Sequence, residues 1–111
     1  ELLELGEDNA ALYYSLSRSL LLTKQPDEAK TVLTKALGKY PKETGLWLNL
    51  AHHHLLSGNE TGAIAIYQQY RGERVAKKYR WEEAVNEDFR EMEAQGISHS
   101  AFANIRQMLS R

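Results

Sequence analysis

The sequence contains no cysteine and only two prolines, Pro26 and Pro41, among its 111 residues. The absence of cysteine excludes a disulfide framework and any metal site built on thiolates. Basic and acidic side chains number 14 and 15, so the chain lacks the basic excess that is typical of dedicated nucleic-acid binders. No apolar run approaches the roughly 20 residues that cross a membrane, and no signal peptide is visible. We therefore expect neither nucleic acid nor a membrane as the partner, and the compartment stays open.

Motifs that carry chemistry are also missing. The sequence has no Gly-x-Ser-x-Gly elbow, no phosphate-binding loop and no cysteine nucleophile. The acidic residues Glu87 and Asp88 are adjacent, so their carboxylates diverge on a helix and do not suit paired acid–base chemistry. We predict a protein that is not an enzyme, with no catalytic residue and no cofactor.

Three consecutive histidines, His52, His53 and His54, are the most conspicuous candidate for metal binding. Histidines of one helix share a metal at a spacing of three or four residues, whereas consecutive residues point about 100° apart. No further Cys, Asp, Glu or His stands four residues away on the same predicted helix. We therefore predict no metal site. We expect His54 to pack between helices, His52 to face a groove and His53 to be partly exposed.

The composition favours helix, because proline is rare while Leu, Ala, Glu and Lys are plentiful. Apolar residues recur at steps of three and four rather than alternating. Pro26 suits a first helical turn, Gly58 and Gly96 suit helix ends, and Ser98 suits a helix cap. The predicted helices cover residues 9–23, 26–38, 43–57, 60–71, 79–94 and 99–110. Short connections make neighbouring helices antiparallel, which predicts stacked helical hairpins.

The segment 72–79 is open to two interpretations. Gly72 favours a break, whereas the residues from Arg74 to Tyr79 are compatible with a helix.

Aromatic residues at Tyr13, Trp47 and Trp81 are spaced by 34 residues each time, which indicates a repeat array. Further positions keep this period: Leu16 with Leu50, Ser17 with Ala51, Leu20 with His54, Ala29 with Ala63, and Leu33 with Tyr67. Small residues at Ala29 and Ala63 allow two helices of a hairpin to approach closely. The aromatic residue then fills the gap between hairpins.

On these residues the chain resembles the tetratricopeptide repeat family. The unit 9–42 carries Tyr13, Leu16, Ser17, Leu20, Ala29, Leu33, Ala36 and Pro41. The unit 43–76 carries Trp47, Leu50, Ala51, Gly58, Ala63 and Tyr67, but has Tyr70 where the family expects a small residue and Val75 where it expects proline. The resemblance implies an all-α fold, a right-handed superhelical stack of about three antiparallel helix hairpins (an α-solenoid).

The third unit, residues 77–111, matches the repeat weakly. It keeps Trp81 but has Asp88 in an aromatic position and Ile97 in place of a small alanine. We interpret it as a degenerate repeat that forms a C-terminal capping hairpin, with one apolar face and one polar face. Because the first residue is Glu1 rather than Met, we expect a single domain cut from a longer protein. Residues 1–8 would then be the remnant of an upstream repeat helix.

Charge is placed unevenly. Residues 71–80 hold five basic side chains and one acidic, whereas residues 82–93 hold six acidic and one basic. Glu83, Glu87 and Glu91 repeat like charge at i,i+4, and each such pair costs about 0.2–0.5 kcal/mol. The acidic stretch is either a dock for a basic partner or a solvated face that the adjoining basic stretch partly neutralises. The basic stretch is short and lacks repeated aromatic platforms, which disfavours nucleic-acid binding.

The inner helices of such an array line a concave groove. The residues predicted to bind a partner there are Tyr14, Arg18, Leu48, Asn49, His52, Tyr79, Glu82 and Asn86. Apolar side chains beside polar ones suit an extended peptide or a short helix. Family members that grip a chaperone's terminal carboxylate use paired lysine, asparagine and arginine side chains. Only Asn49 matches that set, and Glu83 occupies a position where a basic residue would be needed. A chaperone's terminal carboxylate is therefore disfavoured as the ligand.

We therefore predict a non-catalytic scaffold for protein–protein interaction, whose partner is a protein or a peptide. The alternative is a spacer or self-association module of a larger enzyme or signalling protein. Residues 1–5 motivate it, because they resemble half a hairpin whose apolar side, with Leu2 and Leu3, has lost its partner. This edge would support a homo-oligomer.

Overall fold

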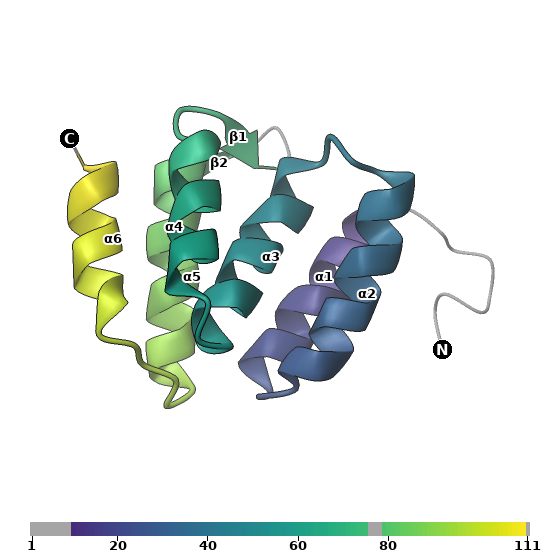
Figure 1. Ribbon diagram of the computed structural model, residues 1–111, viewed down its shortest axis with the longest axis horizontal. Helices are drawn as coiled ribbons and strands as arrows, with labels where there is room; N and C mark the ends of the chain where they lie inside the picture. The colour runs from purple at the N-terminus through teal and green to yellow at the C-terminus, as the bar shows by residue number, and fades with distance from the viewer. Residues whose placement is uncertain (1–9, 76–78, 111) are drawn as a thin grey trace.

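The computed structural model describes residues 10–75 and 79–110. Within these ranges the chain forms six helices and one short antiparallel strand pair (Figure 1). The helices are α1 (Ala10–Leu22), α2 (Pro26–Lys39), α3 (Thr44–Leu56), α4 (Glu60–Gln69), α5 (Trp81–Ala94) and α6 (Ala101–Leu109), and the strands are β1 (Arg74–Val75) and β2 (Tyr79–Arg80). The prediction of a predominantly helical chain is confirmed. The expected remnant at residues 1–8 lies outside the described residues.

Helix ends follow the local chemistry of the sequence, with one exception. Gly58 and Gly96 have φ angles of 90° and 78°, the left-handed conformation predicted for helix ends. The predicted cap at Ser98 is wrong, because α6 begins only at Ala101. The backbone N–H of Ala101 instead donates to the Nδ1 atom of His99 at 3.0 Å. An imidazole nitrogen thus satisfies a donor of the first turn.

The connection between α4 and α5 contains the break that Gly72 favours, together with a strand pair that was not predicted. Residues 74–75 and 79–80 are extended, so α5 begins at Trp81 rather than at residue 79. The strand pair aligns Arg74 with Arg80 and Val75 with Tyr79. Gly72, with a φ angle of 88°, ends the preceding turn, and the carbonyl of Glu73 accepts from the Trp81 N–H at 2.8 Å. This bond therefore satisfies an N–H of the first turn of α5 that has no partner within the helix.

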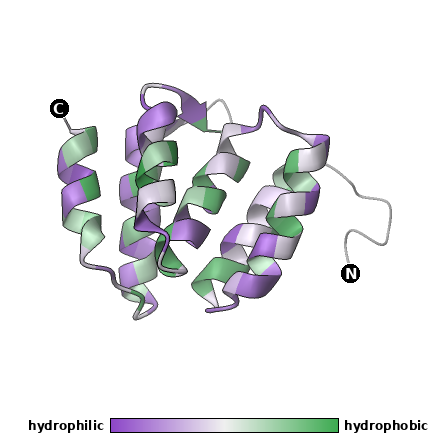
Figure 2. Ribbon diagram, in the orientation of Figure 1, coloured by the Kyte–Doolittle hydropathy of each residue, from purple (hydrophilic) through white to green (hydrophobic). Residues whose placement is uncertain are grey.

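The helices pack mainly on their sequence neighbours, in a row that runs from α1 and α2 to α6 (Figure 1). Helix α3 lies in the middle and packs against α1, α2 and α4, while α6 packs against α4 and α5. Figure 2 shows hydrophobic and hydrophilic residues on each helix, as expected for amphipathic helices in a layered stack. The central place of α3 means that more than one of its faces is covered.

The repeated aromatic residues lie in or beside the core. Tyr13 and Trp81 are buried, and the Trp81 indole N–H donates to the carbonyl of Tyr67 at 2.9 Å. Trp47 is half-buried. Tyr70, a departure from the repeat pattern, lies between the two tryptophans, with ring centroids 5.9 Å from Trp47 and 5.3 Å from Trp81. The large residue therefore continues an aromatic cluster where the family places a small one.

The last helix, α6, packs through aromatic side chains against α5 at the end of this row. Phe102 stacks on Phe89 of α5 with ring centroids 4.1 Å apart, and both rings are buried. The guanidinium of Arg106 lies 5.4 Å from the centroid of Phe89 and donates to Glu93 at 2.9 Å. A cation thus covers the outer side of the aromatic pair.

Candidate functional site

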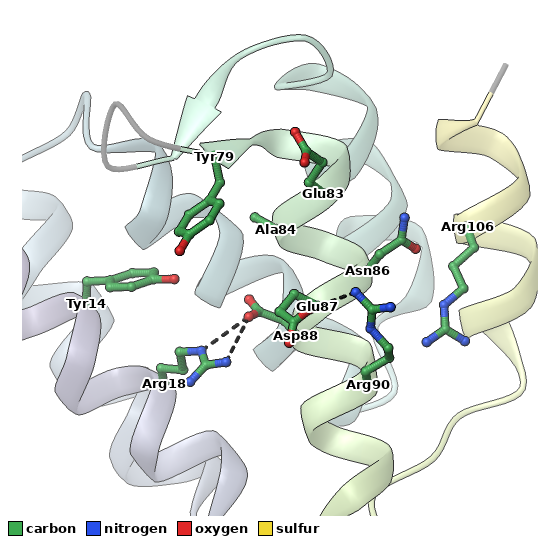
Figure 3. Close-up of a pocket in the computed structure, with 10 residues that line it drawn as sticks. All are labelled: Tyr14, Arg18, Tyr79, Glu83, Ala84, Asn86, Glu87, Asp88, Arg90 and Arg106. Atoms are coloured by element: carbon green, nitrogen blue, oxygen red, sulfur yellow. Dashed lines mark hydrogen bonds and ion pairs between the residues drawn. The ribbon is translucent and has the colours of Figure 1, made fainter.

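A cavity of about 770 Å³ opens between α1 and α5 (Figure 3). Its lining residues are Tyr14 and Arg18 from α1, Tyr79 from β2, Glu83, Ala84, Asn86, Glu87, Asp88 and Arg90 from α5, and Arg106 from α6. Figure 3 shows Tyr14 and Tyr79 together at the side near β2, whereas Asn86 and Arg106 lie toward α6. The two tyrosines therefore lie at the end of the cavity near β2, and Asn86 and Arg106 form a polar end near α6.

Four of the predicted groove residues, Tyr14, Arg18, Tyr79 and Asn86, line this one cavity. They come from two segments that are far apart in the sequence. Tyr14 also fits closely against α3, because a Cβ atom on Gly45 would lie 2.8 Å from its ring. The glycine of α3 therefore leaves the space that the Tyr14 ring occupies.

Three predicted groove residues on α3 are not accessible. Leu48 and Asn49 are fully buried and His52 is 1 % exposed, so the expectation that they lie on an open surface is wrong. The reason is the central place of α3, which neighbouring helices cover. The Asn49 amide nitrogen donates to the carbonyl of Tyr14 at 3.0 Å and to the hydroxyl of Ser17 at 2.9 Å. Asn49 thus joins α3 to α1 from within.

The eighth predicted residue, Glu82, does not line the cavity. One of its carboxylate oxygens accepts from the backbone N–H of Gly72 at 2.6 Å, and the other lies 3.7 Å from the Nε atom of Arg80. The Glu82 side chain therefore supports the turn between α4 and the strand pair. Its part in partner binding stays a prediction.

A chain of polar groups runs from the cavity wall, where Arg18 and Asp88 lie, into the core. The Nε and Nη2 atoms of Arg18 each donate to Oδ1 of Asp88 at 3.2 Å. The Oδ2 atom of Asp88 lies 2.9 Å from Nε2 of His52, and Nδ1 of His52 lies 2.7 Å from the hydroxyl of Tyr67. Asp88, His52 and Tyr67 are all buried. One chain of contacts thus joins α1, α5, α3 and α4.

The direction of these hydrogen bonds follows from donor chemistry. A carboxylate oxygen only accepts, so the Nε2–H of His52 donates to Asp88. In the neutral imidazole, Nδ1 then accepts from the hydroxyl of Tyr67. Every member of the chain has a partner, which is the condition under which buried polar groups are tolerated.

The surroundings shift the pKa values of three side chains in the same direction. Burial raises the pKa of the Tyr67 hydroxyl well above its usual range, and the charge of Asp88 adds to this effect. Burial and Asp88 likewise raise the pKa of Tyr14. Burial alone would lower the pKa of Arg18, but the attraction of Asp88 outweighs it and raises that pKa. Arg18 therefore stays charged, and both tyrosines keep their protons.

The structural role of Asp88 was not predicted, because in the sequence Asp88 is a departure from the repeat and part of an acidic stretch. The available signal was its place beside Val85, Phe89 and Met92 on the apolar stripe of α5, all of which are buried with it. An acidic residue in such a stripe needs buried partners, and Arg18 and His52 are those partners.

The acidic stretch 82–93 pairs mostly with basic residues that lie outside the basic stretch 71–80. Glu87, exposed on the cavity wall, pairs with Arg90 of the same helix at 2.7 Å. Glu93 pairs with Arg106 of α6 at 2.9 Å. From the basic stretch, Arg80 approaches Glu82 at 3.7 Å. Exposed pairs of this kind contribute little stability.

The histidine triplet differs from its prediction in two positions. His53, expected to be partly exposed, is buried, and His52 is buried in the polar chain rather than facing an open groove. His54 is half-buried. In residues 10–75 and 79–110 no three His, Cys, Asp or Glu side chains gather in a way that could hold a metal ion. Over the same residues, no helix is long and apolar enough to cross a membrane.

Acidification is expected to destabilise the fold through His53 and His54. Burial lowers the pKa of His53, aided by His54 and Lys30, and burial and Lys30 lower the pKa of His54. The unfolded chain, whose histidines titrate near pH 6.5, therefore binds more protons than the folded chain. The stability that depends on these two histidines is fully present above pH 6.5. It is lost as the pH decreases from 6.5 toward the lower pKa values that His53 and His54 have in the folded chain.

Thermal unfolding followed by circular dichroism measures this effect. We expect a lower Tm at pH 5.5 than at pH 7.5. The double variant His53→Gln, His54→Gln is expected to show a smaller difference between the two pH values. An equal difference in both proteins would contradict the assignment to these histidines.

The fold and the site define a helical-repeat protein with a cavity between its helices. A family model described as tetratricopeptide repeat matches residues 20–80, more than half of the chain. The chain belongs to the tetratricopeptide repeat family, whose repeats generally mediate protein–protein interactions and are typically non-catalytic. Comparisons with curated proteins and with solved structures find no match.

Proposed function

We propose that this chain is a scaffold that binds a peptide, or an extended segment of a partner protein, in a groove centred on the cavity between α1 and α5. The proposal includes the right-handed superhelical stacking of three hairpins that would give the groove its concave shape. The observation that carries it is the convergence of Tyr14, Arg18, Tyr79 and Asn86 on one cavity. These residues come from two segments that are distant in sequence, and the fold brings them to one surface.

The size and chemistry of the cavity support a peptide ligand. A volume of about 770 Å³ falls within the range of about 300–1,000 Å³ that is typical of ligand pockets. Tyr14 and Tyr79 offer aromatic surface, and Tyr79 is 51 % exposed. Asn86 offers both a donor and an acceptor to a peptide backbone. An apolar side chain of the ligand would contact the tyrosines while its backbone pairs with the polar end.

The test is a selection of random peptides displayed on phage, followed by affinity measurements on the enriched peptides. Asn86→Arg narrows the polar end of the cavity and is expected to weaken binding at least about tenfold, or about 1.4 kcal/mol. Tyr79→Ala removes aromatic surface at the other end and is expected to weaken binding similarly. Circular dichroism checks that both variants keep their helicity.

The matched control is Asn104→Arg, the same substitution at an exposed asparagine of α6 that does not line the cavity. We expect the affinity of this variant to stay within about twofold of the original. Failure to enrich any peptide, or an equal loss in the Asn86 and Asn104 variants, would contradict the proposed groove.

A further inference from the structure

We infer that Asp88 is a built-in carboxylate ligand that occupies Arg18 and His52, holds α1 against α5 and thereby keeps Arg18 from binding an anionic group of a partner. This inference deepens the proposed function, and its consequence for partner selection rests on that function. The contacts from which it is argued lie entirely within this chain. It can therefore be tested without any partner.

Both oxygens of Asp88 are engaged by other helices. Oδ1 accepts two N–H bonds from Arg18, and Oδ2 accepts from His52. The residue is 5 % exposed, yet it lies on the wall of the cavity. A carboxylate in this position has the contacts that a bound acidic ligand would make. The chain supplies that group itself.

The Arg18–Asp88 pair also crosses the candidate groove. Helix α1 packs against α2 and α3, whereas α5 packs against α6 and the strand pair. The ion pair therefore joins α1 to α5 in addition to the contacts that each helix makes with its neighbours (Figure 3). Because His52 binds the same carboxylate from α3, three helices are fixed at one point. The position of Asp88 thus sets how far apart the groove walls stand.

Arg18 is placed where a ligand could otherwise reach it. Its side chain is 30 % exposed and lines both the large cavity and a second hollow beside Ser19 and Gln95. A guanidinium offers five N–H donors in a planar fork, which suits carboxylate groups. Two of the donating atoms are already directed at Asp88. Occupation by Asp88 therefore removes the most suitable anion-binding geometry from the cavity.

Chemical rescue tests the assignment. Asp88→Ala leaves a space of carboxylate size between Arg18 and His52, and the variant is expected to have a lower Tm than the original protein. Sodium formate should raise the Tm of this variant more than equal sodium chloride does. Formamide, a neutral molecule of similar shape, should give no such rise. The original protein should show no formate-specific rise.

The double variant Asp88→Ala, Arg18→Met is the control, because it removes the cation that would hold formate. It is expected to show no formate-specific rise. If Asp88→Ala is unfolded in chloride, formate-induced helicity replaces Tm as the readout. Equal responses to formate and chloride, or the same rise in the double variant, would overturn the inference.

Distance measurement provides a second test that uses a milder change. The chain has no cysteine, so cysteines introduced at exposed positions take spin labels uniquely. Labels at Ser15 of α1 and Ala94 of α5 report the separation of the groove walls. Asp88→Asn keeps the shape of the side chain but removes the negative charge that attracts Arg18, and it replaces one acceptor oxygen with an NH₂ group. We expect a wider or broader distance distribution in this variant.

Labels at Ser15 and at Thr34 of α2 are the control pair, and their distance is expected to stay unchanged. An unchanged distribution between α1 and α5 in Asp88→Asn would overturn the inference. The two proposals fail separately. If no peptide is selected but formate rescue occurs, the groove function fails and the role of Asp88 stands. If peptides bind but neither formate rescue nor widening of the distance occurs, the groove function stands and the role of Asp88 fails.

Discussion

Trp81→Ala is expected to destabilise the fold by about 3–5 kcal/mol, the range for removing a fully buried aromatic side chain. Trp81 is fully buried, its indole N–H donates to Tyr67, and its ring packs against Tyr70. The substitution opens a large cavity at the start of α5 and leaves a buried carbonyl without its donor. A loss of this size is a large fraction of the about 5–15 kcal/mol that stabilises a typical domain, so the variant should unfold at a much lower denaturant concentration.

Trp47→Ala is the matched control, because Trp47 lies 34 residues earlier in the repeat. Trp47 is half-buried, and its indole N–H donates to the carbonyl of Pro41 at 2.8 Å near the surface. We expect this variant to lose about 1–2 kcal/mol, within the common range for single substitutions. Urea unfolding followed by circular dichroism measures both. Equal losses would contradict the assignment of Trp81 to the core and Trp47 to its edge.

His52→Leu is expected to cost about 2–4 kcal/mol. Leucine is of suitable size and polarity for a core, so the loss does not come from poor packing. It comes from Asp88 and Tyr67, which each lose a buried hydrogen-bond partner. An unsatisfied buried polar group costs about 1–3 kcal/mol. The same polar chain ties four helices, so the loss should appear as a lower free energy of unfolding of the whole fold.

His54→Leu is the matched control two positions away. His54 is half-buried and takes no part in the polar chain. Its replacement is expected to change the free energy of unfolding by no more than about 0.5 kcal/mol, as is usual away from core features. Denaturant unfolding of both variants provides the comparison. Equal destabilisation would show that the polar chain does not carry the effect.

The helices were predictable because their signals are local. Periodic apolar residues, Pro26 at a helix start and the left-handed glycines Gly58 and Gly96 place most helix bounds within a few residues of the observed ones. The strand pair was not predicted, because the residues from Arg74 to Tyr79 are also compatible with a helix. Only the tertiary contacts of the turn, such as the bond from the Thr44 hydroxyl to the carbonyl of Arg74, favour the extended form.

The candidate site was predictable only in part, for a different reason. Repeat register indicates which residues of a first helix face inward. It predicted a groove with Tyr14 and Asn86, and both residues line the cavity. Register does not indicate how much of that face the neighbouring helices cover. On α3 they cover Leu48 and His52 completely, because this helix has neighbours on more than one side. Likewise, no spacing in the sequence pairs Arg18 with Asp88, which meet only in the folded chain.

Partner binding at the cavity is tested most directly by nuclear magnetic resonance. An enriched peptide is titrated into the ¹⁵N-labelled protein while backbone amide shifts are recorded. The proposed groove predicts the largest changes on α1 and α5 around Tyr14, Arg18, Tyr79 and Asn86, with the outer faces of α2 and α4 little changed. Changes confined to α2 and α4, with the cavity residues unaffected, would contradict it.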